Sequence, residues 1–332
     1  MLTRNHFLKT SSLCGIGALI SPLPISKSKK NKKLESIGLN LFSAPKILEE
    51  DFEGSIKSLS EIGIDQLETY GPYSISDQRN KSSWAALTPM LGFNASGFFG
   101  KASHEFKAIL NSYGISVPSM HTDLYTLEDN MGALALEANT LGAKYVVLPF
   151  IPDHERITID DYKKVADRFN QIGENAKKEG ISFAYHNHGY GLTPGSNGVR
   201  PIDLIFDHTD PSYVFFEMDL FWTVAGKADP IDLLVSNSGR YKMLHIKDMK
   251  ELSYFSGDGS TPDQWKELFP MLVAAGEGVI NLDEIIRIAM DNGVEHYIIE
   301  HDLAPDPLAN ISEASNYPVS YTHLTLPTKV RV

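Results

Sequence analysis

From residue 36 onward, short runs of β-branched and aromatic residues alternate with longer segments in which apolar residues recur at helical spacing. The short runs are too apolar to show the strict polar alternation of a solvent-facing strand. This is typical of parallel strands that are covered on both faces. We therefore predict eight strands, at residues 36–42, 63–70, 114–121, 143–150, 180–188, 213–221, 241–249 and 295–302.

The segments between these runs have the pattern of amphipathic helices, for example 51–63, 158–180 and 282–293. Several end in Gly directly before the next strand, as expected for a helix stop. Eight strand–helix units predict an α/β fold of the (β/α)8 TIM-barrel type in a single domain. A doubly wound open sheet is the alternative, but no Gly-x-Gly-x-x-Gly follows the first run and no Gly-x-x-x-x-Gly-Lys occurs.

One connection is much longer than the others. Residues 72–101 are rich in Ser, Gly and Phe, and we expect them to be an elaborated loop over one end of the barrel, where long loops shape substrate pockets. Its aromatic residues could form a lid or simply cover the barrel; they are Trp84, Phe93, Phe98 and Phe99.

Composition narrows the classes of function. Hydrophobic residues make up 42% and charged residues 22% of the 332 residues, which is ordinary for a globular protein with a sizeable core. The net charge of -12 and the absence of a basic stripe exclude a nucleic-acid-coating surface and favour a small neutral or metal-chelating substrate. The single cysteine, Cys14, excludes an internal disulfide and a cysteine-based zinc cluster.

The two ends of the chain differ from the rest. Residues 1–33 combine a basic start, an apolar stretch at 13–25 that is too short to span a bilayer comfortably, and a basic polar stretch. We expect a signal peptide or disordered leader there, the barrel at 34–318, and a non-native tail at 319–332 that breaks the helical pattern. The leader resembles a twin-arginine export signal in which Asn5 replaces the second arginine, so we expect a periplasmic or secreted protein without a stable membrane span; a cytoplasmic protein is the alternative.

Polar residues stand at the ends of nearly all the predicted strands, and the ends of barrel strands are where chemistry occurs in this fold. In the segment 183–190, alternate side chains share a face, so His186 and His188 point the same way. Each such residue alone could be a satisfied polar group of the rim. The full set of strand-end residues comprises Glu68, His121, Asp123, His186, His188, Glu217, Asp219, His245, Lys247, Asp248, Glu300 and Asp302.

Converging carboxylates and imidazoles without a cation would repel one another or stay unpaired, at a cost of several kcal/mol. The set as a whole therefore predicts a site for one divalent cation. Mn²⁺, Zn²⁺, Co²⁺, Fe²⁺ and Mg²⁺ are the candidates because these ions accept oxygen ligands, nitrogen ligands or both. Trp222 is expected to lie in the core or the pocket wall, together with Phe215 and Phe221.

Five segments, in the order 181–190, 214–230, 243–249, 276–285 and 297–302, resemble the sugar phosphate isomerases/epimerases of the xylose-isomerase-like TIM barrels. The resemblance covers residues 36 to 312 and points to a secreted bacterial subgroup with His-Asn-His and Asp-x-x-Trp motifs. It implies one divalent metal, with Mn²⁺ as the first choice, held by a Glu, an Asp, a His and a Glu from the last four strands.

Carried over by motif, the implied metal ligands are Asp219, His245 and Glu300, with His186 in the place of the first Glu and Glu217 as a nearby substitute. Gly191 stands where relatives often carry a substrate-binding Glu. The resemblance also implies a proton shuttle between two bases beside a metal-polarised carbonyl, for which this chain offers Glu300 with His188 or Glu217.

Four further residues are expected to contact the substrate, namely Glu68, His121, Lys247 and Trp222. The chain is then a metal-dependent isomerase or epimerase acting on a sugar or keto-sugar, or a dehydratase or hydratase of a keto-sugar on the same barrel. A phosphodiesterase and a non-catalytic sugar-binding barrel are weaker alternatives. No nucleic-acid partner is expected, and a homo-oligomer remains open.

The N-terminal pattern generates the first testable prediction. N-terminal sequencing of the protein isolated from its native host should find that the chain begins near Leu34, because the preceding residues have the plan of a cleaved leader. Cell fractionation should place this shortened chain outside the cytoplasm. A chain that begins with Met1 in the cytoplasmic fraction would contradict export.

Overall fold

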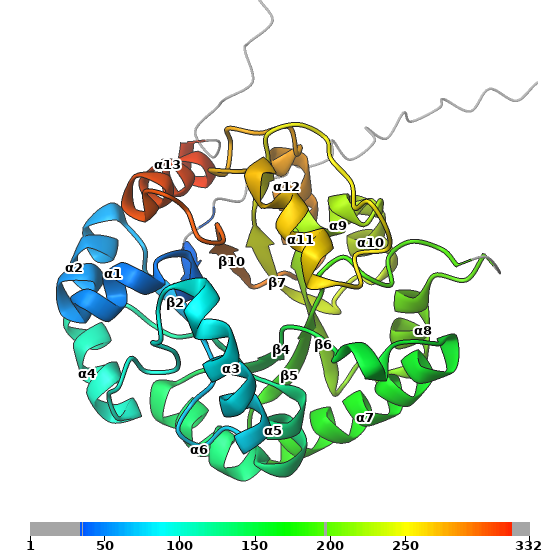
Figure 1. Cartoon of the computed structure of the whole chain (residues 1–332), viewed down its shortest axis with the longest axis horizontal. Coiled ribbons are helices and arrows are strands. Elements are labelled where there is room, and N and C mark those ends of the chain that lie inside the picture. The colour runs from blue at the N-terminus through cyan, green and yellow to red at the C-terminus, as the bar shows by residue number, and fades with distance from the viewer. Residues whose placement is uncertain (1–33, 35, 196–197, 321–332) are drawn as a thin grey trace, which may run out of the picture. The chain divides into compact units, whose positions relative to one another are not determined.

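The computed structural model describes residues 34, 36–195 and 198–320. Within them, eight parallel strands close into a barrel in chain order, with the last strand, β10, pairing with the first, β1 (Figure 1). Each predicted run contains one barrel strand, which confirms the TIM barrel. The strands are β1 (Gly38–Asn40), β2 (Gln66–Tyr70), β3 (Ser119–His121), β4 (Tyr145–Leu148), β5 (Ser182–His186), β6 (Val214–Asp219), β7 (Tyr241–Ile246) and β10 (His296–Ile299).

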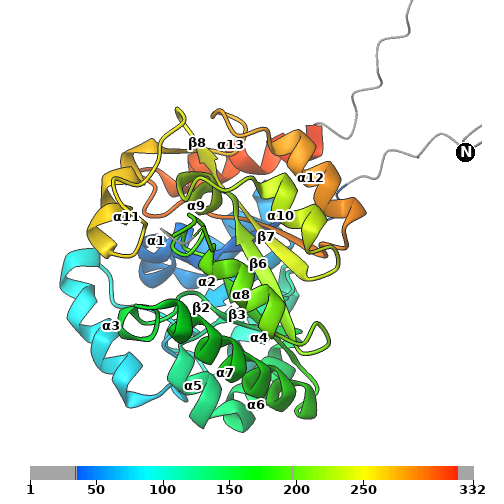
Figure 2. The same ribbon diagram turned by 90° about the vertical axis from the view of Figure 1, so that its right-hand side faces the viewer.

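Helices surround the barrel, and each predicted helical segment contains one or more of them (Figures 1 and 2). The α-helices are α1 (Pro45–Glu50), α2 (Phe52–Ile62), α3 (Gln78–Leu91), α4 (Ser103–Ser112), α5 (Leu124–Asp129), α6 (Met131–Leu141), α7 (Ile159–Lys178), α8 (Pro201–His208), α9 (Leu220–Ala225), α10 (Pro230–Ser236), α11 (Pro262–Leu268), α12 (Leu282–Asp291) and α13 (Pro307–Ser320). Short 3-10 turns lie at Leu41–Ser43, Asp153–Glu155 and Phe269–Met271.

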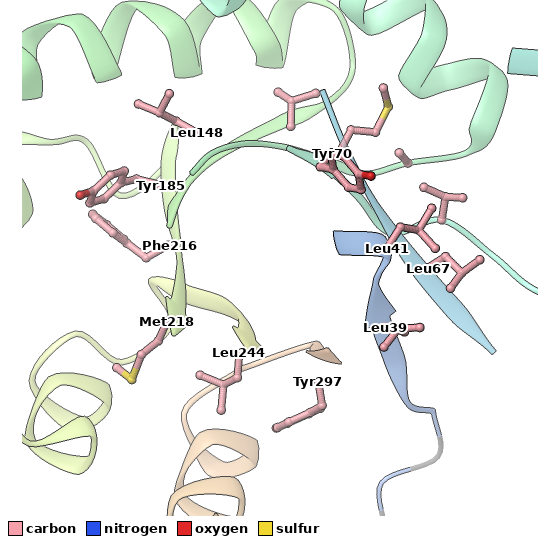
Figure 3. Packing of buried hydrophobic residues seen from close by; sticks show 14 of the residues in the cluster. Leu39, Leu41, Leu67, Tyr70, Leu148, Tyr185, Phe216, Met218, Leu244 and Tyr297 are labelled. Carbon is pink, nitrogen blue, oxygen red and sulfur yellow. The ribbon is translucent and has the colours of Figure 1, made fainter. Parts of the chain in front are cut away.

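The main core fills the space between the strands and the helices. Side chains on the outer face of the barrel, among them Leu39, Tyr185 and Phe216, lie in this layer (Figure 3). Helix α7 comes close to the barrel at Gly173, where a Cβ atom would lie 2.4 Å from the carbonyl oxygen of Tyr213. The absence of a side chain at Gly173 therefore allows this close packing.

A second apolar cluster lies inside the barrel. Tyr145, Val147, Ala184, Met243 and Ile298 pack together although they come from strands that are not all neighbours, which places them on the inner face. Since alternate residues of a strand face the same side, the next inward residues along these strands are polar: His186, His245 and Glu300 follow Ala184, Met243 and Ile298 two positions later. The barrel interior is thus apolar near the middle of the strands and charged near their C-terminal ends.

The predicted strand at 241–249 is shorter in the structure. It ends at Ile246, and β8 (Asp248–Met249) turns away to form an antiparallel pair with β9 (Leu272–Val273). The carboxylate of Asp248 accepts backbone N–H bonds from Met249, Gly276, Gly278 and Ile280 at 2.8 to 3.1 Å. These four bonds hold the following loop against the ribbon and explain why the chain leaves the barrel there.

The long connection at 72–101 is not only a loop, because it contains the 14-residue helix α3. Figure 2 shows α3 and α11 projecting at the same end of the barrel. Phe93 and Phe98 are buried and pack against Phe42 and Tyr73, so they cover the barrel, whereas Trp84 lines a pocket at the mouth.

The leader predicted at residues 1–33 lies outside the described residues, as does most of the tail predicted at 319–332. Both remain predictions. In the part of the chain that the structure describes, no helix combines the length and the apolar character needed to cross a bilayer.

The packing of α7 on the barrel gives a prediction about stability. Phe169 is fully buried, with ring centroids 5.1 and 5.3 Å from those of Phe183 and Tyr185. Phe169→Ala should lower the free energy of unfolding by about 3 to 5 kcal/mol, because it removes apolar contacts and leaves a cavity. Leu136→Ala is the control, since Leu136 is 68% exposed and its loss should change stability by less than about 0.5 kcal/mol. Chemical denaturation of both variants measures the difference, and equal stabilities would contradict this packing.

Candidate active site

The charged layer at the top of the barrel forms because paired strands end in register. His186 is the strand partner of Glu217, and Asp219 is the partner of His245. Glu68, Glu217, Asp219 and His245 are fully buried, with no exposed surface. The strand ends therefore bring these predicted site residues into one buried cluster.

Three histidines converge on one carboxylate oxygen, Oε2 of Glu217. It lies 2.8 Å from Nε2 of His121, 2.9 Å from Nδ1 of His186 and 3.4 Å from Nε2 of His245. Glu68 reaches the same place, with its Oε1 at 3.0 Å from His121 Nε2 and 2.6 Å from His245 Nε2. We call His121, His186, Glu217 and His245 the histidine group.

A lysine and three carboxylates form the neighbouring contacts. The Nζ atom of Lys247 lies 2.7 Å from Glu300 Oε2, 2.7 Å from Asp302 Oδ2 and 3.1 Å from Asp219 Oδ2. Glu300 Oε2 also accepts a hydrogen bond from Nδ1 of His245 at 2.7 Å. We call Asp219, His245 and Glu300 the carboxylate group; it shares His245 with the histidine group.

Opposing charges shift the pKa values of the histidine group. Burial opposes the charge on His121, but Glu68 and Glu217 outweigh it and raise the pKa of His121 to about 9. Burial and Glu68 also oppose ionisation of Glu217, but His245 and His121 hold its pKa at about 2. In contrast, burial lowers the pKa of His186 well below its usual value, with the charge of His245 acting in the same direction. A neutral His186 is thus available as a ligand.

The pKa values of the carboxylates Asp219 and Glu300 are also shifted in opposite directions. Burial raises the pKa of Asp219 to about 6 although Lys247 and His245 oppose the rise. For Glu300, the charges of Lys247 and His245 overcome burial and hold the pKa well below its usual value. Glu300 is therefore an ionised carboxylate at neutral pH.

These residues fit a divalent cation. Five carboxylates, of Glu68, Glu217, Asp219, Glu300 and Asp302, lie in this cluster with one lysine, and the raised pKa values of His121 and His245 place part of the balancing positive charge on these two rings. Oε1 of Glu217 is buried and has no hydrogen-bond partner. Oδ2 of Asp219 also lacks one, because its 3.1 Å contact with Lys247 does not have hydrogen-bond geometry. Both groups hold three or more donor atoms within 4.8 Å of one another, so the cluster could hold a metal.

A pocket of about 270 Å³ opens above the cluster. Its floor includes His121, His186, His188 and Glu300, and Asp302 lies beside them. Its outer wall is largely apolar and includes Phe42, Tyr70, Trp84, Leu87 and Phe150.

Helix α3 contributes one face to this wall. Asn80, Ser83, Trp84 and Leu87 line the pocket at the spacing i, i+3, i+4, i+7, which places them on one side of the helix. The Nδ2 atom of Asn80 donates to Asp123 Oδ2 at 2.7 Å and ties α3 to the loop after β3. The long connection therefore contributes one part of the pocket wall at this end of the barrel.

The ring of His188 lies in the pocket floor in a fixed orientation. Its Nδ1 is 2.6 Å from the carbonyl oxygen of Pro149, so Nδ1 carries the proton and Nε2 has the free lone pair. Burial lowers the pKa of His188 to about 3, and the charge of Lys247 acts in the same direction. His188 is therefore neutral at pH 7 and a weaker base than an ordinary histidine.

Other predicted residues lie behind the pocket. Glu68, Glu217, Lys247 and Trp222 are at most 1% exposed, and the described pocket lining does not include them. Trp222 stacks with Phe255 at a centroid distance of 5.6 Å, and its ring lies 5.6 Å from Lys247 Nζ. Among the four residues expected to contact substrate, His121 is the one that the pocket lining includes.

Several lining residues received no role from the sequence. Asp302 was noticed as a strand-end residue but was not assigned a function, and burial raises its pKa against the charge of Lys247. Thr122 is buried, and its Oγ1 has no hydrogen-bond partner although Thr122 lines the pocket. Thr122 directly follows the strand-end residue His121, and this position is the sequence signal that could have identified it.

Comparisons with known proteins agree with this architecture. A sequence model of the family described as xylose isomerase-like TIM barrel matches residues 57–316. Inosose dehydratase of Clostridium perfringens is 25% identical over 238 residues, which cover 68% of this chain and 71% of that protein.

Two solved structures share the fold. A sugar phosphate isomerase/epimerase from Parabacteroides distasonis has a TM-score of 0.67 at 22% identity, covering 92% of this chain and 99% of that one. The IOLI protein, solved with a zinc atom, has a TM-score of 0.59 at 14% identity, covering 86% and 96%. Relatives of this chain are enzymes, and the chain is an enzyme as well. Since the family model matches more than three quarters of its length, the chain belongs to the xylose isomerase-like TIM-barrel family.

Proposed function

We propose that the chain is a metal-dependent sugar isomerase or epimerase that removes a proton next to a carbonyl group. A dehydratase or hydratase acting on a keto-sugar is the second candidate, favoured by the similarity to inosose dehydratase. The observation that carries the proposal is the pocket floor, where the ionised Glu300 and the neutral His188 lie beside a buried cluster able to hold a cation.

A divalent metal is part of this proposal. His245 belongs to both groups that could hold it, and the zinc atom in the structurally similar IOLI protein supports its presence. When bound, such an ion polarises a carbonyl group and stabilises the negative charge that develops on its oxygen. The residues implied by the family resemblance are His186, Asp219, His245 and Glu300.

Glu300 is proposed as the group that takes the carbon-bound proton. Its Oε2 is held by Lys247 and His245, each at 2.7 Å, so the carboxylate has a fixed position at the pocket floor. The same two contacts keep it ionised. A fixed, ionised carboxylate next to a bound substrate can act as a general base.

His188 and Asp302 are proposed to handle the second proton. The free Nε2 of His188 can accept a hydrogen bond from a substrate hydroxyl, while its pKa of about 3 makes it a weak base. Asp302 has a raised pKa and lines the same pocket, so it can hold a proton to donate. Return of a proton to carbon would give an epimer or isomer, whereas its delivery to a leaving hydroxyl would give elimination.

The pocket wall favours a neutral sugar over a phosphorylated one. The described lining contains the acidic residues Asp123, Glu300 and Asp302 and no Lys or Arg. Lys247 lies behind the floor and is already held by three carboxylates. A phosphate would meet repulsion here, whereas aromatic rings such as Trp84 can pack against the C–H face of a sugar. The same acidity disfavours a phosphodiester substrate.

The shared residue His245 gives a prediction about metal content. Purified wild-type protein should contain about one equivalent of divalent metal, and His245→Ala should lose most of it, because both candidate ligand groups lose a donor. His104→Ala is the matched control, since His104 is exposed on α4. Elemental analysis after dialysis measures the content. Equal metal in the His245 and His104 variants would contradict the metal site.

Proton exchange gives a prediction about the reaction. With keto-sugars in D₂O, the metal-loaded enzyme should replace a carbon-bound proton by deuterium, as followed by NMR. His188→Ala should slow this exchange by roughly 10²-fold or more and keep its metal, because His188 acts on the substrate in this proposal.

The products separate the candidate reactions. Deuterium in a stereoisomer or a ketose–aldose partner indicates epimerisation or isomerisation, and an unsaturated or water-added product indicates the dehydratase or hydratase. A phosphodiesterase or a binding barrel would cause no exchange. Absence of exchange with every keto-sugar in a broad panel would count against the proposal.

A further inference from the structure

We propose that the cation binds in the histidine group, and that Lys247 occupies the carboxylate group as a built-in cation. This assignment differs from the ligand set implied by the family resemblance, which combines His186 with the three members of the carboxylate group. It rests on the proposed function only in assuming that the chain binds a divalent metal. The proposed ligands are His121, His186, Glu217 and His245.

The histidine group already has donor spacings close to those of a metal site. Its three nitrogens lie 2.8, 2.9 and 3.4 Å from Oε2 of Glu217. Metal–donor bonds of about 2.0 to 2.2 Å place neighbouring donors roughly 3.0 to 3.5 Å apart. In this group, a cation could therefore replace the protons that now link the rings to the carboxylate without a large movement of the strands.

Glu217 gives an independent reason for a cation. Its Oε1 is completely buried and has no hydrogen-bond partner, although its Oε2 has three nearby nitrogens. Burying a carboxylate with an unpaired oxygen is unfavourable unless another charge compensates for it. A divalent cation beside Glu217 would supply that charge.

The orientation of His245 also favours the histidine group. Its Nδ1 faces Glu300 Oε2 at 2.7 Å, and its Nε2 points to Glu68 Oε1 at 2.6 Å and to Glu217 Oε2 of the histidine group at 3.4 Å. A ring that donates Nδ1–H to a carboxylate presents Nε2 to a metal, which is the usual arrangement of a metal-bound histidine. In the carboxylate group, the same Nδ1 would have to lose its proton and the hydrogen bond to Glu300.

Lys247 already places a positive charge within the carboxylate group. Its Nζ contacts Asp219, Glu300 and Asp302 at 3.1, 2.7 and 2.7 Å, and the residue is 1% exposed. A divalent ion bound by Asp219 and Glu300 would lie within a few ångströms of this ammonium group and would be repelled by it. Glu300 is then free to act as a base because it is not a ligand.

The proposed position remains within reach of substrate. His121 and His186 line the pocket, whereas Glu217 and His245 lie behind them, so a cation between the four would lie at the pocket floor. Glu68 Oε1 lies 3.0 Å from Nε2 of His121 and 2.6 Å from Nε2 of His245, so this carboxylate also faces the proposed position. Three imidazoles and one carboxylate favour Zn²⁺, Co²⁺ or Fe²⁺ over Mg²⁺.

X-ray absorption spectroscopy of the zinc-loaded protein tests the assignment without measuring activity. The wild-type spectrum should fit about three imidazole ligands, and that of His121→Ala should fit about two. Glu217→Gln should weaken zinc binding by more than the roughly 10- to 100-fold that loss of a residue outside the coordination shell costs. Asp219→Asn is the matched control, since it makes the same change in an equally buried carboxylate, and it should keep three imidazoles. Circular dichroism confirms that each variant folds.

The outcomes separate this inference from the proposed function. Two or fewer imidazoles in the wild type, or a count that does not change in His121→Ala, would overturn the assignment. Loss of zinc in Asp219→Asn but not in Glu217→Gln would also overturn it and would support the ligand set from the family resemblance. Three imidazoles together with no proton exchange on any keto-sugar would support the metal assignment while contradicting the proposed reaction.

Discussion

The balance of charge inside the barrel mouth is the constraint on which the site depends. Five carboxylates are packed with one lysine and several histidines at a place where Glu68, Glu217, Asp219 and His245 have no contact with solvent. Unpaired buried charges would destabilise the fold by several kcal/mol each. Each group in the cluster therefore has a pKa that depends on its neighbours, and a bound cation could replace the positive charge that the raised pKa values place on His121 and His245.

The apolar packing of the closed barrel stabilises the fold against the cost of burying these charges. The inward side chains are apolar near the beginning of the strands, as in the cluster of Tyr145, Met243 and Ile298, and polar near their ends. Because the strands are in register, the polar ends meet on one level. The outer layer of apolar contacts, seen in Figure 3, holds the strands in place while the mouth remains charged.

The pocket at the C-terminal end of the barrel is lined by two kinds of surface, a floor and a wall. The floor holds Glu300 and His188, whereas the wall combines residues of α3 with Phe42, Tyr70 and Phe150 from other parts of the chain, and the described lining contains no lysine or arginine. Residues of α3 therefore shape the pocket without belonging to the charged cluster.

The sequence by itself determined the eight barrel strands and most of the residues of the charged cluster, because buried parallel strands leave continuous apolar runs and their ends carry the polar side chains. It could not show that α3 forms inside residues 72–101, since none of the residues of α3 is buried and its sequence lacks a clear apolar face. Only the tertiary structure decided that Glu217 and Lys247 lie behind the pocket, that Lys247 pairs with three carboxylates, and that burial lowers the pKa of His188 to about 3. These features depend on distances between side chains from different strands, and spacing along one chain does not contain those distances.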